Sequence, residues 1–342
     1  MVGGEFEFSI HNTIKEGIKS SFEGYYYSSG RAALYHIISH AISKKHYKQI
    51  LLPDYLCDSI IDIVNLFKIP IKYYTVNIDL TIDIDKIEDI YKERSIILFI
   101  NYFGVVNNSC YYEFIKHKNK GVCLIEDDVQ AFYIMNNKTT ADYSFTSFRK
   151  SFAVPDGGWV KTKHKGLKKP EAKNHFVQYK IAASVLKNNR EKFSEIQDAF
   201  YLSLFKHGEK LINSDLFASM SSITTNKIQT IDFESIKKKR KENATFLIKE
   251  LENLEILPIV NCNKGVPLFI PIRLKNRDKI RRVMFSKEIF CPVHWPVRSN
   301  DNKNLKRGVE LSSCELSLIV DQRYNTEQLF DIVEIIKDNM DV

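Results

Sequence analysis

Two adjacent cations, Arg149 and Lys150, lie between a strand-like stretch and a turn. Residues 143–148 alternate aromatic and hydroxyl side chains, which predicts a strand with one buried face. Residues 155–158, Pro-Asp-Gly-Gly, predict a turn, because glycine adopts backbone conformations that other residues avoid. We expect the arginine to lower the pKa of a lysine fixed on this turn, which makes Lys150 a candidate nucleophile. A solvated hairpin tip is the alternative interpretation.

The second group suited to chemistry is a serine–glycine sequence at the start of a predicted helix. Ser28, Ser29 and Gly30 precede apolar residues at helical spacing. This order predicts a capped helix whose first backbone amides bind an anion such as phosphate. A capped helix without a ligand is the alternative.

Three consecutive acidic residues, Glu126, Asp127 and Asp128, follow a predicted strand at residues 122–125. Residues 95–100 form a similar apolar run, and such runs are typical of a parallel sheet that is covered on both faces. Open α/β sheets bind their ligands at the carboxyl ends of the strands. The acidic residues are therefore candidates for a ligand site, with structural capping as the alternative.

The segments that must position these groups alternate between strand and helix from residue 28 to residue 160. This alternation predicts a three-layer, doubly wound, mainly parallel α/β sheet with right-handed crossovers. The predicted strands of this part are residues 49–53, 71–76, 95–100 and 122–125. The predicted helices are residues 59–67, 83–91 and 111–117.

The rest of the chain predicts a helical region and a smaller C-terminal domain. Residues 165–255 are mainly helical in pattern, with apolar residues at helical spacing in 184–207 and 234–254. From residue 266 the pattern is α+β, with strands at 267–272 and 316–320, an edge segment at 291–296, and helices at 279–285 and 326–339. We therefore expect a large domain, residues 1–240, and a small α+β domain, residues 241–342. We expect His294 and Trp295 to be packed in an edge strand rather than catalytic.

Composition limits the class of protein. Of 342 residues, 44% are hydrophobic and 27% are charged, which is typical of a globular chain with a sizeable core. The six cysteines form no Cys-x-x-Cys pair, so we expect reduced, mostly buried thiols and no metal site. No apolar run reaches the ~18 residues that a membrane span needs, and the first residues lack a signal-peptide pattern. We expect a cytoplasmic protein that binds no membrane.

The net charge of +8 favours an anionic substrate, such as a phosphorylated or nucleotide-linked compound. The densest basic run, residues 237–241, begins a predicted amphipathic helix, and we interpret it as a solvated face. Nucleic-acid binding needs a recognisable module, which the sequence lacks. The chain also has no Gly-x-Gly-x-x-Gly motif, which disfavours a nicotinamide-dinucleotide cofactor.

Four stretches, in order along the chain, resemble the DegT/DnrJ/EryC1/StrS-type sugar aminotransferases, which have the fold of type I pyridoxal-phosphate (PLP) enzymes. They are residues 28–33, 125–131, 147–158 and 319–324. The resemblance spans nearly the whole chain. It implies a PLP cofactor, a nucleotide-linked keto sugar as substrate, an amino-acid donor such as glutamate, and a homodimer.

The resemblance also implies roles for single residues around the PLP ring. Asp127 matches the aspartate that pairs with the pyridine nitrogen and keeps it protonated, so that the ring accepts electrons. Gln130 matches a residue close to the ring and its phenolic oxygen. Tyr55 or Cys57 falls where the family places a group that covers the ring face.

For the cofactor phosphate, Ser29, Gly30 and Arg31 match the helix start that binds it through backbone amides. The loop after the 95–100 strand matches a family loop, which implies that Tyr102 or Phe103 lines the pocket. We do not recognise, within residues 165–255, the Gly/Asn/Arg segment with which the family crosses its dimer interface.

The lysine that bonds to the cofactor is the point where this chain departs from the family. Counting back from Gly157 and Gly158 places it at residue 149, which is arginine and cannot be deprotonated. Either the turn is one residue shorter and Lys150 is the nucleophile, or the protein binds PLP without transferring amino groups; we favour Lys150. Arg149 and Ser147 would then be available to bind the phosphate.

Two functions follow from these observations. The first is a PLP-dependent aminotransferase that acts on a nucleotide-linked keto sugar in surface-polysaccharide or secondary-metabolite biosynthesis. The alternative is a catalytically degenerate PLP-fold protein that acts as a binding or assembly partner.

Overall fold

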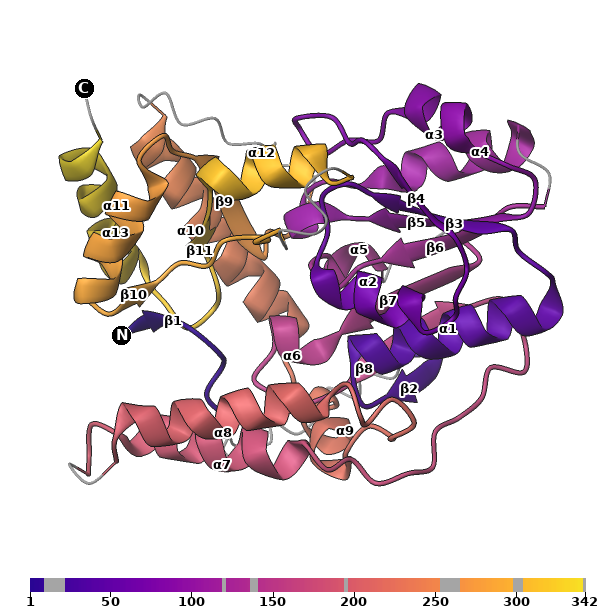
Figure 1. The fold of residues 1–342 in the computed structure, drawn as a ribbon. Coiled ribbons are helices and arrows are strands. Elements are labelled where there is room, and N and C mark those ends of the chain that lie inside the picture. The colour runs from indigo at the N-terminus through magenta and orange to yellow at the C-terminus, as the bar shows by residue number, and fades with distance from the viewer. Residues whose placement is uncertain are drawn as a thin grey trace. The chain divides into compact units, whose positions relative to one another are not determined.

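The computed structural model of the chain describes residues 1–8, 22–118, 121–135, 141–193, 196–252, 265–297 and 304–340 (Figure 1). The chain divides into two compact units. Unit 1 comprises Met1–Gly4, His46–Ala141 and Phe233–Val342, and unit 2 comprises Glu5–Lys45 and Asp142–Asp232. The division at residue 240 that the sequence suggested stays a prediction.

Unit 1 contains a four-stranded parallel sheet. Its strands, in sheet order, are β6 (Cys123–Asp127), β5 (Ser95–Ile100), β3 (Gln49–Pro53) and β4 (Ile71–Tyr74). Every residue of β3, β5 and β6 is buried, as expected for apolar strands that are covered on both faces. β3 and β5 have the bounds that the sequence predicted. Ile100 lies opposite Asp127, so β5 and β6 end at the same edge of the sheet.

Short helices connect these strands, because parallel neighbours need a crossover connection. They are α2 (Asp58–Asn65), α3 (Ile84–Ile90), the 3-10 turns η1 (Tyr102–Gly104) and η2 (Asn108–Tyr111), and α4 (Tyr112–Lys118). Helix α5 (Phe132–Met135) follows β6, the last of these strands in the chain. The predicted helices at 59–67, 83–91 and 111–117 are confirmed, with bounds that differ by a few residues.

The C-terminal part of unit 1 packs helices on a two-stranded antiparallel sheet, β9 (Phe269–Arg273) and β11 (Glu315–Ile319). β1 (Val2–Gly3) pairs with β10 (Ile289–Phe290) in a second small sheet. The helices of this part are α10 (Phe233–Leu251), α11 (Arg277–Ser286), α12 (Lys306–Cys314) and α13 (Thr326–Asn339). The predicted bounds of α13 are confirmed; a capping box formed by Asn325 and Gln328 fixes its start.

The predicted edge strand at residues 291–296 is wrong. This segment has no strand structure, although it lies beside β11, where the N–H of Ser317 donates to the carbonyl of Pro292 (3.0 Å). Proline supplies no N–H, and the segment contains two prolines, which prevents a regular ladder.

Unit 2 contains three antiparallel strands in the order β2 (Tyr25–Tyr27), β8 (Gly158–Thr162) and β7 (Tyr143–Ser147). Helix α1 (Gly30–Lys44) packs against β7 and β8. The strand predicted at residues 143–148 is confirmed as β7, but the prediction of one buried face is wrong, because all five residues of β7 are buried. Arg149 and Lys150 lie not on a hairpin tip but on a single helical turn, α6 (Phe148–Ser151), directly after β7.

The remainder of unit 2 is helical, with α7 (Val177–Asn189), α8 (Asp198–Leu211) and α9 (Ser222–Ile228). The mainly helical pattern predicted here is confirmed, and residues 184–207 belong to two helices. α7 and α8 pack against each other (Figure 1), with Ala183, Tyr201 and Phe205 in a shared apolar cluster. Helical periodicity continues across the connection, so the pattern does not reveal the chain reversal.

A buried carboxylate fixes the Pro-Asp-Gly-Gly turn. Asp156 is fully buried, and its Oδ2 accepts hydrogen bonds from the N–H of Ser221 (2.7 Å) and from Asn174 Nδ2 (2.8 Å). Its Oδ1 accepts from the hydroxyls of Ser221 and Thr224. The turn is thereby tied to the start of α9, whose N-cap is Ser221.

We predict that Asp156→Ala lowers the free energy of unfolding by about 2–4 kcal/mol, because several buried donors lose their acceptor. Urea unfolding followed by circular dichroism measures this change. Asp79→Ala is the matched control, since Asp79 is exposed and accepts hydrogen bonds only from Thr81 among the residues described, and it should change the same quantity by less than about 0.5 kcal/mol. Equal effects of the two substitutions would contradict the anchoring role of Asp156.

Candidate functional site

The start of α1 and the glycine turn form one compact structure in unit 2. Ser29 caps the helix, since its Oγ accepts the N–H of Ala32 (3.1 Å), which confirms the predicted N-cap. The N–H of Gly157 donates to the carbonyl of Ser28 (2.7 Å). A β-carbon at Gly158 would lie 2.1 Å from the carbonyl oxygen of Ser29, so only glycine allows this approach.

The hydroxyl of Ser147, at the end of β7, faces the same turn. It donates a long hydrogen bond to the carbonyl of Gly157 (3.5 Å), and that carbonyl also accepts the N–H of Phe148 (3.0 Å). The structure therefore brings Ser147, the start of α6 and the glycine turn together. The predicted contacts of Ser147, Ser29 and Gly30 with a phosphate stay predictions.

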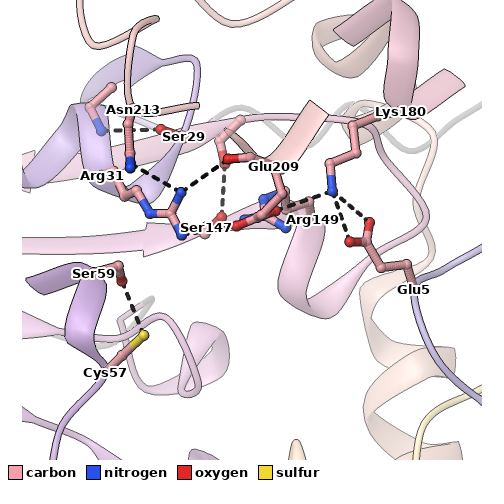
Figure 2. A network of polar contacts seen from close by, with 12 residues as sticks. Glu5, Ser29, Arg31, Cys57, Ser59, Ser147, Arg149, Lys180, Glu209 and Asn213 are labelled. Atoms are coloured by element: carbon pink, nitrogen blue, oxygen red, sulfur yellow. Dashed lines mark hydrogen bonds and ion pairs between the residues drawn. The ribbon is translucent and has the colours of Figure 1, made fainter. Parts of the chain in front are cut away.

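A carboxylate from α8 bridges the two predicted phosphate-binding arginines. Figure 2 shows Glu209 between Arg31, Arg149 and Lys180. Glu209 Oε1 accepts from Arg31 Nη2 (2.9 Å) and Arg149 Nη2 (3.1 Å), and Oε2 accepts from Lys180 Nζ (3.1 Å). Lys180 is buried, and it also donates to both carboxylate oxygens of Glu5 (2.8 and 3.0 Å).

Sequence reasoning missed Glu209, Lys180 and Glu5. Glu209 and Lys180 come from the helical region, which carries no motif, and Glu5 comes from the first residues of the chain. A buried lysine needs a paired acid, but the sequence does not show which lysine is buried. The only signal available was an acid or base on the apolar face of a predicted helix.

The charges around Glu209 decide its protonation and leave a positive surplus. Burial alone would raise the pKa of Glu209, but Arg149, Lys150, Lys180 and Arg31 together hold it well below its usual range. These four cations outnumber the carboxylates of Glu209 and Glu5 by two charges. A guanidinium has five N–H donors, so its bond to Glu209 is compatible with binding a second anion. The cluster therefore suits an anion with two negative charges, such as a phosphate monoester.

Lys150, at the end of α6, has an exposed side chain. It interacts electrostatically with the Glu209 carboxylate. The sequence-based expectation considered only Arg149, because Glu209 is 59 positions away in the chain and its proximity is a tertiary feature.

Asp127 is a buried acid of unit 1. It ends β6 and is 5% exposed, and burial raises its pKa to about 7, while the hydrogen bond from the N–H of Val129 (2.9 Å) lowers it in part. Glu126 and Asp128 both accept from Asn101 Nδ2 (2.8 and 2.7 Å), which gives these two acids a structural role. Side chains alternate along a strand, so Asp127 points to the other face. It suits a cationic partner such as a protonated pyridine.

The predicted ring-covering residues of unit 1 have different surroundings. Tyr55 is fully buried, with its ring centroid 5.6 Å from that of Tyr102 and 5.1 Å from that of Trp295. Cys57 precedes α2, and its Sγ lies 3.1 Å from Ser59 Oγ (Figure 2). The four rings of Tyr55, Tyr102, Phe103 and Trp295 form what we name the aromatic cluster.

The aromatic cluster joins several predicted site residues with two that sequence reasoning assigned to packing. Gln130 Oε1 accepts the N–H of Phe103 (3.0 Å), and the hydroxyl of Tyr102 donates to the carbonyl of Tyr55 (2.6 Å). The hydroxyl of Tyr55 donates to the carbonyl of His294. His294 and Trp295 thus contact predicted site residues. Tertiary packing brings them there, and no local sequence motif indicates this.

Other expectations concern groups outside this site. Arg240 is buried and its Nε donates to Gln322 Oε1 (3.0 Å), so the interpretation of residues 237–241 as a solvated face is wrong for this residue. Cys57, Cys123, Cys291 and Cys314 are free thiols, of which Cys123 and Cys291 are buried, while Cys262 and the side chain of Cys110 lie outside the described part of the chain. Within the part of the chain that the structure describes, no cluster of His, Cys, Asp and Glu side chains is arranged to bind a metal ion. No helix there has the length and apolarity needed to cross a membrane.

Comparison with known proteins identifies the fold. No protein-family model matches the sequence, and no curated protein matches it. Solved structures match over most of the chain, and they show that it has the fold of the sugar aminotransferases, the type I fold of PLP enzymes. The predicted fold class is confirmed.

Three solved structures illustrate the likeness. The Streptococcus pneumoniae protein Spr1654 in its PLP form is 14% identical, with a TM-score of 0.69 over 98% of this chain and 92% of that chain. The sugar aminotransferase CalS13 from Micromonospora echinospora is 13% identical, with a TM-score of 0.64 over 92% of this chain and 87% of that chain. A DegT DnrJ EryC1 StrS aminotransferase from Brucella abortus is 14% identical, with a TM-score of 0.62 over 92% of this chain and 85% of that chain.

We predict that Asp127 makes the stability of the protein without added cofactor fall as the pH rises. Its pKa of about 7 in the folded chain exceeds the unfolded value of 3.8, so its contribution is complete below about pH 4 and is lost as the pH passes through about 7. The difference in unfolding free energy between wild type and Asp127→Asn should change by on the order of 4 kcal/mol over this range.

Urea unfolding at a series of pH values measures this difference. Asp79→Asn, at an exposed position, is the control, and its difference from wild type should stay constant over the same range. A constant difference for Asp127→Asn as well would show that Asp127 is not held in an unfavourable ionised state.

Proposed function

We propose that this chain is a PLP-dependent aminotransferase that transfers an amino group from an amino acid such as glutamate to a nucleotide-linked keto sugar. The proposal places it in surface-polysaccharide or secondary-metabolite biosynthesis, as a cytoplasmic homodimer. The observation that carries it is Asp127, a buried carboxylate at the end of β6 in a chain with the fold of the sugar aminotransferases.

PLP, when bound, supplies an aldehyde that bonds to amines and a ring that accepts electrons from the substrate carbon. The Asp127 carboxylate would hold a proton on the ring nitrogen. Burial raises the pKa of Asp127 to about 7, so the groups of unit 1 alone do not fully stabilise the negative charge of its ionised form. A pyridinium would supply the compensating positive charge, so the residue fits the cofactor.

The groups of unit 2 fit a phosphate. The first backbone amides of α1, capped by Ser29, point out of the start of a helix of 15 residues. The positive surplus around Glu209 matches a dianion. Arg31 and Arg149 would bind the phosphate while Glu209 holds their guanidinium groups in place.

Lys150 would supply the reactive amine. Arg149 cannot serve, because a guanidinium stays protonated at any working pH. The Nζ of Lys150 would take a proton from the substrate carbon and return it to the cofactor side, which is general acid–base catalysis by one group. In this proposal Arg149 promotes loss of the proton from Lys150.

The substrate assignment rests on the likeness to sugar aminotransferases and on charge. CalS13 is a sugar aminotransferase, and the present chain carries a net charge of +8, which favours an anionic compound such as a nucleotide sugar. The aromatic cluster, which includes the buried Tyr55, would cover one face of the PLP ring, and Gln130 would lie near its phenolic oxygen.

We predict that Lys150 is the residue labelled when the protein is incubated with PLP and reduced with borohydride. Mass spectrometry of the digested protein should find the added mass on the peptide that contains Lys150, and Lys150→Ala should lose the label. Lys161→Ala, a change of another lysine on β8, is the control and should keep it. A label at a different lysine, or uptake of no PLP by the wild type, would contradict the proposal.

We predict that the protein converts a nucleotide-linked keto sugar into the amino sugar when glutamate is the donor, detected by mass spectrometry. Lys150→Ala should reduce the rate by about 10³-fold or more. Binding of PLP without conversion of any keto sugar would instead favour the catalytically degenerate alternative, in which the protein serves as a binding or assembly partner.

A further inference from the structure

Strand β11 carries two fully buried polar residues, Glu315 and Ser317. Residues two apart on a strand project from the same face, and here the hydroxyl of Ser317 donates to Glu315 Oε1. Burying a carboxyl group is costly unless hydrogen bonds compensate it. The proposed chemistry uses neither residue, so their partners indicate what the pair does.

The pair holds His294 by two separate contacts. The backbone N–H of His294 donates to Glu315 Oε2 (2.7 Å), and the ring nitrogen Nδ1 lies 2.7 Å from Ser317 Oγ. The hydroxyl of Ser317 therefore links the imidazole of His294 to the carboxyl group of Glu315 by hydrogen bonds. The carbonyl of the same residue accepts the hydroxyl of Tyr55 in the aromatic cluster.

We propose that Glu315, Ser317 and His294 form a proton relay, in which Glu315 is a positioning residue that decides, through Ser317, which ring nitrogen of His294 carries the proton. The role of this relay in the reaction rests on the proposed function. In that function the aromatic cluster covers the PLP ring, and two of its members, Tyr55 and Trp295, lie beside His294.

The proton count follows from the contacts. With Glu315 ionised, the Ser317 hydroxyl donates to the carboxylate, so Nδ1–H of His294 must donate to Ser317 Oγ, and Nε2 is an acceptor. When Nε2 takes up one proton, the Nδ1 proton passes to Ser317 Oγ and the hydroxyl proton passes to Glu315. All three groups are then neutral, and Nε2 has become a donor. One proton is gained and no other bond changes.

Burial favours the neutral form of the relay. It raises the pKa of Glu315 to about 8, while the hydrogen bonds from Ser317 and His294 lower it in part. Among the described residues, the charged and titratable groups beside Glu315 include Arg273, opposite it on β9, Arg277 and Arg281 on α11, Cys291 and Tyr55. Burial raises the pKa of Cys291 to about 12 and that of Tyr55 well above its usual range, so both stay neutral in this range.

The neutral form suits the proposed substrate. Carbonyl and hydroxyl oxygens of a keto sugar accept hydrogen bonds, and Nε2–H of His294 is a donor in that form. The imidazole is also confined, with ring centroids 5.6 Å from Phe103 and 5.0 Å from Phe269, so its orientation is set by packing as well as by Ser317. A confined polar group beside aromatic side chains is typical of sites that fix a ligand's orientation.

Nitrogen-15 NMR of the histidine rings, on protein without added ligand, tests the relay directly. His294→Asn identifies the resonances of His294 among the nine histidines. We expect the Nε2–H tautomer below about pH 8 and the Nδ1–H tautomer above it. Ser317→Ala should abolish this transition, whereas Ser286→Ala, which removes an exposed hydroxyl bonded to the carbonyl of Val283, should keep it.

One tautomer throughout the range in the wild type, or a transition that survives in Ser317→Ala, would overturn the relay. If Ser317→Ala does not fold, the wild-type titration and Glu315→Gln decide, because glutamine cannot take up the proton and should hold a single tautomer.

Kinetics with the keto sugar test the role in the reaction. Ser317→Ala should raise the KM for the sugar about three- to tenfold, with kcat nearly unchanged, and should remove the change in KM near pH 8. An unchanged KM would show that the relay does not serve the substrate. Failure of the wild type to transfer an amino group at all would reject the proposed function. The NMR experiment would still decide whether the relay exists, because it does not depend on the reaction.

Discussion

Unit 2 depends on the close contact between the glycine turn and the first residues of α1. Gly158 approaches the carbonyl of Ser29 so closely that any side chain would collide with the backbone. Asp156 holds the turn from its other side through four hydrogen bonds, and the carbonyl of Gly157 accepts the N–H of Phe148 at the start of α6. The start of α1 and the helical turn α6, which carries Lys150, are therefore both positioned by their contacts with the glycine turn.

Electrostatics complements this contact. A lysine as buried as Lys180 requires paired acids, and Glu5 and Glu209 provide them. Glu209 also binds Arg31 and Arg149, so the same carboxylate that compensates a buried cation orients the two guanidinium groups. The cluster keeps a surplus of positive charge although its members are well paired, and this surplus supports the proposal that it binds an anion.

In unit 1, burial acts on two carboxyl groups with different outcomes. It raises the pKa of both Asp127 and Glu315, to about 7 and about 8. Glu315 is enclosed by donors from its own unit, so its proton can be shared with Ser317 and His294. Asp127 accepts the backbone N–H of Val129 through Oδ1 and lies on the opposite strand face from its acidic neighbours, and we propose that a cationic ligand compensates its charge.

The sequence alone determined the local features: the strands Gln49–Pro53 and Ser95–Ile100, the helix Thr326–Asn339, the cap at Ser29 and the acid at Asp127. Each follows from apolar runs, caps or strand ends within a few residues. Tertiary structure decided the rest, because Arg31 and Glu209 are 178 positions apart and Lys180 and Glu5 are 175 apart. Pairs of buried charges at such separations leave no local pattern, and neither does the hydroxyl that links Glu315 to His294. The sequence also did not reveal the break between α7 and α8, because helical periodicity indicates which face of a helix is buried and not where the chain reverses.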